Sequence, residues 1–107
     1  MSKLTKYCNS LIEYKRRTSR VVHIGDIPLG GNYPIRLQSM TTTNTMDTQG
    51  TIDQSIRMID AGSEYVRITA PSIQESKNLL EIKKGLKQRG YTAPIIADIH
   101  FTPNAAL

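Results

Sequence analysis

Three short apolar segments typical of β-strands end at evenly spaced positions in this chain. Gln38, Ile68 and Asp98 lie at or next to the last residues of these segments, so the strand ends follow one another at intervals of 30 residues. The residues between them carry apolar side chains at the three- and four-residue spacing of an amphipathic helix. Repeated strand–helix units of this length predict parallel strands that lie side by side and are joined by right-handed crossovers.

Helix signals separate these strands, which we place at residues 35–38, 65–69 and 94–99. The first helix is predicted to begin at Thr51, because Thr51-x-x-Gln54 resembles a capping box in which side chains bind free N–H groups. It is predicted to end at Gly62, since glycine readily takes the left-handed conformation found after helices. The second helix is predicted to open at Ser72-x-x-Glu75 and to stop before Gly90.

The fold class that fits this alternation is α/β. We expect the N-terminal part of a (βα)8 TIM-type barrel, with about three βα units preceded by a β-hairpin over residues 21–35. A closed barrel needs about 250 residues, whereas this chain has 107, so residues 21–107 are predicted to form an incomplete barrel domain. A third helix is predicted to begin at Pro103 and to be unfinished at Leu107. An open doubly wound sheet has the same repeat, and three units do not distinguish it from a barrel.

Residues 1–20 form a basic N-terminal segment that differs in charge from the rest. They hold six basic residues and one acidic residue, and this excess of five equals the formal net charge of the whole chain, +5. Such a segment can bind nucleic acid or an anionic surface, but a charged run is more often a solvated face. Aromatic residues are poorly interleaved with the charges, so we expect no nucleic-acid groove. A short helix is predicted over residues 4–16.

The cysteine count and the hydropathy exclude several classes of protein. Cys8 is the one cysteine, so the chain forms no internal disulfide and no cysteine metal cluster of its own. This usage is typical of a reducing compartment, and we expect a cytoplasmic location. No apolar run is long enough to cross a bilayer, and the N-terminus lacks the apolar core of a signal peptide. We therefore expect no membrane association.

In parallel α/β folds, ligands bind at the carboxyl ends of the strands. The first such end is rich in hydroxyl and amide groups from Gln38 to Thr45, with Ser39 and Thr41 nearest the strand. Hydroxyls and loop N–H groups can hold phosphate oxygens. The same residue types are equally common in turns and helix caps. The residues alone leave phosphate binding and capping as equal alternatives for this loop.

The second and third strand ends carry charged and titratable side chains. Arg67 lies in an apolar strand, where an unpaired guanidinium is costly and where its planar fork suits a phosphate or a buried ion pair. Asp98 and His100 alternate onto one side of the third strand. They can perform acid–base chemistry, bind an anion, supply two metal ligands or form a satisfied polar pair. Their position at strand ends favours a functional site.

Five motifs occur in order with a spacing similar to that of one enzyme family. They are Arg16-Arg17-x-Ser19-Arg20, Ile24-Gly25-Asp26-x-Pro28-x-Gly30, Pro34-Ile35-x-x-Gln38-Ser39-Met40-Thr41, Val66-Arg67-Ile68 and Ala97-Asp98-Ile99-His100-Phe101. The segment from Arg16 to Leu107 thereby resembles the N-terminus of the 4-hydroxy-3-methylbut-2-enyl diphosphate synthases. These are iron–sulfur oxidoreductases of the non-mevalonate pathway of isoprenoid (terpenoid) biosynthesis.

The resemblance implies a reaction and a set of partners. Family members have an N-terminal (βα)8 barrel and a C-terminal domain that holds a 4Fe-4S cluster. They reductively open 2-C-methyl-D-erythritol 2,4-cyclodiphosphate with electrons from ferredoxin or flavodoxin, and they act as homodimers. The cysteine ligands of the cluster have no match in this chain. We therefore expect the 107-residue chain to be inactive alone.

The resemblance also assigns roles to individual residues. Arg67 matches a diphosphate-binding arginine. Asp98 and His100 match an Asp-Ile-His motif with catalytic and substrate-binding roles, in which His100 contacts the diphosphate and Asp98 orients it or contacts substrate hydroxyls. Ser39 and Thr41 match the first substrate loop. No metal ligand is assigned in this chain.

Two other classes of protein remain as alternatives. One is a different phosphate-binding barrel enzyme of the pterin-binding or aldolase-like kind, which a downstream sequence without clustered cysteines would favour. The other is a nucleic-acid-binding module that uses residues 1–20. Strongly salt-dependent binding that is lost when these residues are deleted would favour this second class.

Overall fold

A three-stranded parallel sheet forms the centre of the computed structural model, which describes Cys8 and residues 10–107. Its strands are β3 (Gln38–Met40), β4 (Tyr65–Thr69) and β5 (Ile95–Asp98), and they lie in the order β3-β4-β5. Gln38 pairs with Tyr65 on one side of β4, and Thr69 pairs with Asp98 on the other. The strands are therefore parallel and adjacent, as the 30-residue repeat predicts.

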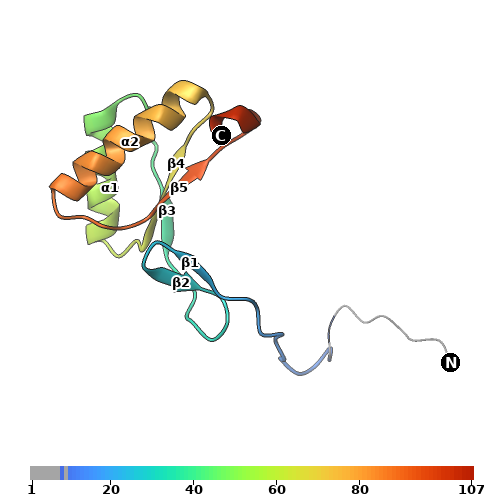
Figure 1. The fold of residues 1–107 in the computed structure, drawn as a ribbon. Helices are drawn as coiled ribbons and strands as arrows, with labels where there is room; N and C mark the ends of the chain where they lie inside the picture. Colours follow the sequence, from blue (N-terminus) through green and yellow to red (C-terminus); the bar gives the residue numbers. More distant parts are fainter. Residues whose placement is uncertain (1–7, 9) are drawn as a thin grey trace.

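Two helices, α1 (Thr48–Asp60) and α2 (Ile73–Gln88), connect the strands and cover one face of the sheet (Figure 1). The core lies between the helices and β4, and it is formed by Ile52, Ile56, Val66, Ile68, Ile82 and Leu86. Side chains alternate across a strand, so Val66 and Ile68 face the helices while Arg67 and Thr69 face the opposite side. The face without helices therefore carries the polar side chains of the strand ends.

The predicted start of the first helix is wrong by three residues. Asp47 is the N-cap, and its carboxylate accepts the N–H of Gly50 at 3.1 Å. Thr51 lies inside α1, is fully buried and donates its hydroxyl to the carbonyl of Asn44 at 3.1 Å. Aspartate is a better N-cap residue than threonine, and the burial of Thr51 leaves the cap to Asp47. The helix ends as predicted, with Gly62 at φ +118°.

The second helix begins at the predicted place. Ser72 is its N-cap, and the Ser72 hydroxyl contacts the carboxylate of Glu75. Gly90, at φ +86°, follows its end. Pro103 opens a single 3-10 turn, η1 (Pro103–Ala105), where the third helix was expected to begin. Among the residues that the structure describes, no helix is long and apolar enough to cross a bilayer.

The predicted hairpin is confirmed and lies across the amino end of the sheet (Figure 1). Its strands are β1 (Val22–Ile24) and β2 (Ile27–Leu29), which pair antiparallel. The Tyr65 hydroxyl, at the start of β4, donates to the carbonyl of Ile27 at 2.9 Å. Arg36 donates from Nε to the carbonyl of Pro28 at 2.8 Å and pairs with Glu64 at 3.1 Å. The hairpin is thus tied to the end of the sheet opposite the expected site.

The first strand of the sheet was predicted three residues too early. Ile35 is 86% exposed, and residues 34–37 form no strand. The N–H of Leu37 donates to the carboxylate of Glu64 at 3.0 Å, and its carbonyl accepts the N–H of Tyr65 at 3.2 Å. Pairing with β4 therefore begins at Gln38. The position of the strand is determined by this pairing and not by the apolar residues that precede it.

The predicted helix over residues 4–16 is wrong where the structure describes it. Residues 1–7 and 9 lie outside the described residues, and residues 10–16 form no helix. The Ser10 hydroxyl accepts the N–H groups of Ile12 and Glu13 in a short bend. Leu11 and Ile12 are 82% and 93% exposed, so their apolar side chains have no surface to pack against. A helix this short is not stable in water without such packing.

Candidate functional site

Three of the predicted site residues meet at the carboxyl edge of the sheet. Arg67 Nη2 lies 3.2 Å from Oδ2 of Asp98, and His100 Nε2 lies 3.5 Å from the same oxygen. Asp98 pairs in register with Thr69, which shares a face of β4 with Arg67. The alternation of two neighbouring strands therefore brings one carboxylate between a guanidinium and an imidazole.

The three side chains differ in exposure. Asp98 is 17% exposed, whereas the side chains of Arg67 and His100 are 43% and 39% exposed. A partly exposed ion pair contributes little to the stability of the fold, and one carboxylate contacts both heads. Arg67 has five N–H donors, and its Nε is buried without a hydrogen-bond partner among the described residues. The guanidinium thus has an N–H donor that no described residue occupies.

Ser39 and Thr41 lie beside this cluster rather than in it. Ser39 pairs in register with Val66, whose side chain faces the helices, so Ser39 lies on the face opposite Arg67. Thr41 is 5% exposed, and its N–H donates to the carbonyl of Arg67 at 3.0 Å. Its hydroxyl is buried and has no partner within the described part of the chain. Thr41 thus contacts the backbone of β4 but not the charged side chains.

The N–H groups expected to bind phosphate in the first loop include two that a helix side chain already occupies. Gln54 Oε1 accepts the N–H groups of Thr42 and Thr43 at 2.9 and 3.2 Å. Gln54 Nε2 donates to the Thr42 hydroxyl at 2.9 Å. For these two donors, the structure favours the capping interpretation over phosphate binding. The sequence pattern predicts that Gln54 caps its own helix, and no local pattern distinguishes that role from the observed one.

The same loop is secured by its last residue, Thr45, and by Asn78, which the sequence did not single out. The Thr45 hydroxyl donates to the carbonyl of Thr69, the last residue of β4, at 2.7 Å. Asn78 of α2 donates from Nδ2 to the carbonyl of Thr45 at 2.7 Å and to the hydroxyl of Thr48 at 2.9 Å. These partners are 24 to 33 residues apart in sequence, so no local pattern reveals them.

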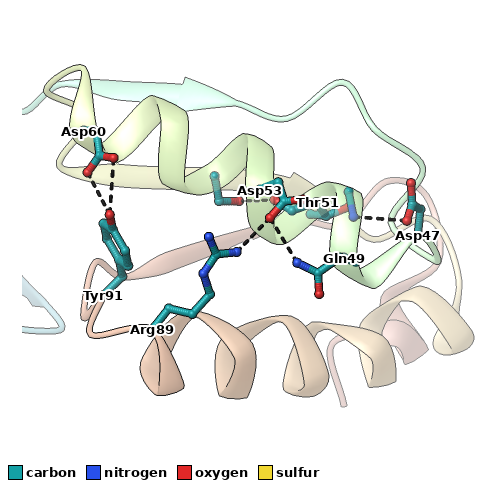
Figure 2. Close-up of polar contacts among 9 residues, drawn as sticks. Asp47, Gln49, Thr51, Asp53, Asp60, Arg89 and Tyr91 are labelled. Carbon is teal, nitrogen blue, oxygen red and sulfur yellow. Dashed lines mark hydrogen bonds and ion pairs between the residues drawn. The ribbon is translucent and has the colours of Figure 1, made fainter.

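A separate set of polar contacts joins the two helices on their outer side (Figure 2). Asp53 of α1 accepts from Arg89 at 2.7 Å and from Gln49 at 3.0 Å, and these hydrogen bonds, that of Arg89 foremost, lower the pKa of the Asp53 carboxyl. The Tyr91 hydroxyl donates to Asp60 at 3.0 Å, which raises the pKa of Tyr91. These groups hold α1 against the C-terminal end of α2 and have a structural role.

The donor set does not fit a resident metal or cluster. Within residue 8 and residues 10–107, no three His, Cys, Asp or Glu side chains gather closely enough to hold a metal ion. A 4Fe-4S cluster is normally held by about four cysteine thiolates, and the chain has one cysteine, Cys8. The residues present here therefore do not hold such a cluster.

A parallel α/β sheet with Arg67, Asp98 and His100 at its carboxyl edge has the arrangement of a barrel-type enzyme domain that binds ligands at its strand ends. Residues 19–107 match the family model of the GcpE TIM-barrel domain. The chain belongs to this family.

Three relatives illustrate the similarity. The chain is 55% identical over 90% of its length to the 4-hydroxy-3-methylbut-2-en-1-yl diphosphate synthase (flavodoxin) of Porphyromonas gingivalis. It is 57% identical over 87% of its length to the protein of that name from Parabacteroides distasonis. It is 45% identical over 95% of its length to the chloroplastic, ferredoxin-type synthase of Oryza sativa subsp. japonica. The chain spans 16%, 15% and 14% of these relatives, respectively.

Proposed function

We propose that this chain is part of the substrate-binding barrel of a 4-hydroxy-3-methylbut-2-enyl diphosphate synthase. The observation that carries the proposal is the convergence of Arg67 and His100 on one Asp98 carboxylate at the carboxyl edge of the sheet. It occurs in a chain that is about half identical to proteins named as that synthase. In this proposal β3, β4 and β5 are three consecutive strands of a (βα)8 barrel.

The ligand is 2-C-methyl-D-erythritol 2,4-cyclodiphosphate, and the chain supplies groups for its diphosphate. Arg67 donates paired N–H groups to phosphate oxygens, because a planar guanidinium matches their geometry. His100 adds a second donor from its partly exposed ring. Asp98 does not bind the anion, since like charges repel; its carboxylate orients Arg67 and His100. Ser39 and Thr41 remain proposed substrate-loop residues, with Thr41 acting close to the Arg67 backbone.

The remaining parts of the reaction belong to other regions of a full-length synthase. A 4Fe-4S cluster supplies the reducing chemistry in the family that the sequence resembles, and its ligands are not in this chain. Flavodoxin or ferredoxin, which the names of the relatives include, is the proposed electron donor. A homodimer is the proposed assembly.

Turnover by the full-length protein that carries this chain tests the proposed function. With a reconstituted cluster and reduced flavodoxin, we expect conversion of the cyclic diphosphate to 4-hydroxy-3-methylbut-2-enyl diphosphate, measured by product chromatography. Omission of the reductant is the control and should abolish the product. A protein with an intact cluster that leaves the cyclic diphosphate unchanged would show that the proposal is wrong.

A further inference from the structure

The hydrogen-bond ladder between β3 and β4 continues after β3 has ended. The N–H of Thr41, one residue past β3, donates to the carbonyl of Arg67 at 3.0 Å. Two residues further along β4, the carbonyl of Thr69 accepts from the side-chain hydroxyl of Thr45 at 2.7 Å. In a parallel ladder, this position would normally be taken by a backbone N–H. The Thr45 hydroxyl therefore replaces a strand donor at the carboxyl edge.

This hydroxyl is held firmly in place. Thr45 is 5% exposed. Its own carbonyl accepts from Asn78 Nδ2 at 2.7 Å, which connects the loop to α2. The residue is thus fixed between a helix on one side and a strand end on the other.

The carboxyl end of β4 is consequently held by hydrogen bonds on both sides, one from β5 and one from the loop that follows β3. On the β5 side, the N–H of Ala70 donates to the carbonyl of Asp98 at 2.9 Å. On the β3 side, the hydroxyl of Thr45 holds the carbonyl of Thr69. Arg67 lies two residues before Thr69, and Asp98 is the register partner of Thr69. The same strand end therefore sets the relative position of Arg67 and Asp98.

We infer that Thr45 is a positioning residue of the diphosphate site, acting through the Thr69 carbonyl on the Arg67–Asp98 pair. The inference rests on the proposed function. Loss of the Thr45 hydroxyl frees the end of β4 on one side and lets Arg67 move relative to Asp98. Small displacements of a binding group are costly, because a ligand is held only in a narrow range of geometries. Thr45 itself does not need to contact the ligand.

The test compares Thr45→Val with Thr45→Ser in the full-length protein. Valine keeps the shape of threonine and removes the donor, whereas serine keeps the donor. We expect Thr45→Val to raise KM for the cyclic diphosphate about three- to tenfold, the size of one lost hydrogen bond, with kcat close to that of the wild type. Thr45→Ser should restore most of the wild-type KM. Asn78→Ala, which frees the other side of Thr45, should also raise KM.

Ser55→Ala is the matched control. The Ser55 hydroxyl is buried and donates to the carbonyl of Thr51 inside α1, so its loss should lower thermal stability and leave KM unchanged. An unchanged KM in Thr45→Val, or an equal rise in Ser55→Ala, would overturn the inference. If Thr45→Val does not fold, an unchanged KM in Asn78→Ala would overturn it. A wild-type protein without turnover would instead refute the proposed function, and the inference with it.

Discussion

In the proposed site, Asp98 organises two donors without binding the ligand itself. Its carboxylate is the least exposed group of the cluster and contacts both Arg67 and His100. A diphosphate would repel the Asp98 carboxylate and attract the donors of Arg67 and His100, which are more exposed than Asp98. In this proposal, the groups that matter most for binding are the Arg67 and His100 heads, which remain partly exposed.

Arg67→Ala should mainly weaken binding of the cyclic diphosphate in the full-length protein. Removing a charged, fork-shaped donor is expected to lower affinity about ten- to a hundredfold, which corresponds to about 1.4 to 2.8 kcal/mol. Arg67→Lys should recover only part of this loss, since an ammonium lacks the planar fork. Steady-state kinetics measure the change in affinity for the cyclic diphosphate. The absorbance of the reconstituted cluster, which should be unchanged, shows separately that the cluster is intact.

Arg57→Ala is the control for charge alone, because Arg57 is an exposed residue of α1. It should leave the affinity for the cyclic diphosphate unchanged. An Arg67→Ala protein with wild-type affinity and turnover would mean that Arg67 has a structural role.

At the scale of elements, the two helices pack so closely that one position has no room for a side chain. A Cβ atom added at Gly85 of α2 would clash with Cδ1 of Ile52 in α1, and it would lie 3.3 Å from Cγ1 of Ile52. Ile52 is 4% exposed and belongs to the core, so it has little space to move away. Helix propensity and packing therefore oppose each other at this glycine.

Gly85→Ala should lower the thermal unfolding temperature, although alanine gains about 1 kcal/mol of helix propensity over glycine. Overpacking of a core typically costs about 1 to 3 kcal/mol, so packing is expected to dominate. Adding Ile52→Val, which removes Cδ1, should restore part of the loss, and the coupling of the two changes identifies the contact. A more stable Gly85→Ala protein would mean that the helices can move apart.

The contact between Asp53 and Arg89 should make the stability of the chain depend on pH. The hydrogen bond from Arg89 lowers the pKa of Asp53 below its ordinary value of 3.8. The contribution of this contact to the free energy of unfolding is therefore fully present above pH 3.8. It is lost as the pH falls through the lowered pKa of Asp53 in the folded state. The Asp53→Asn chain should be less stable than the wild type at pH 5, and the difference should shrink toward about pH 2.

Thermal unfolding of both chains across this pH range measures the effect. Glu81→Gln is a suitable control, because Glu81 forms a fully surface-located pair with Lys84 at 3.3 Å within one helix. A difference between wild type and Asp53→Asn that stays constant with pH would contradict the expected linkage.

At the scale of the whole molecule, the described residues build a sheet with one face covered by helices and one face without helices, whose carboxyl edge is polar. β3 and β5 each pair with β4 alone in the described structure, and the core occupies the helix side. The strand ends carry donors for an anion on the open side. This division suits the proposed role of the chain as a ligand-binding part of a larger enzyme.

The 107-residue chain alone should therefore show no reductase activity. It has a single cysteine and no group of three metal-binding side chains among its described residues. Incubation with the cyclic diphosphate and reduced flavodoxin, followed by product chromatography, checks this expectation. The full-length protein serves as the positive control, and any product formed by the isolated chain would contradict the assignment of redox chemistry to other regions.

The sequence by itself determined the parallel order of the strands, the second helix and the placement of Arg67, Asp98 and His100 at the ends of neighbouring strands. Periodicity and strand-end placement are local properties, and parallel geometry converts them into neighbours in space. Only the tertiary structure decided that Asp47 caps α1, that β3 begins at Gln38, and that Thr45 holds β4. Those outcomes depend on which hydroxyl, carboxylate or N–H group contacts a partner distant in sequence. Several groups of similar chemistry compete for each role, and local propensity does not separate them. Burial and strand pairing in the folded chain determine which group forms the contact.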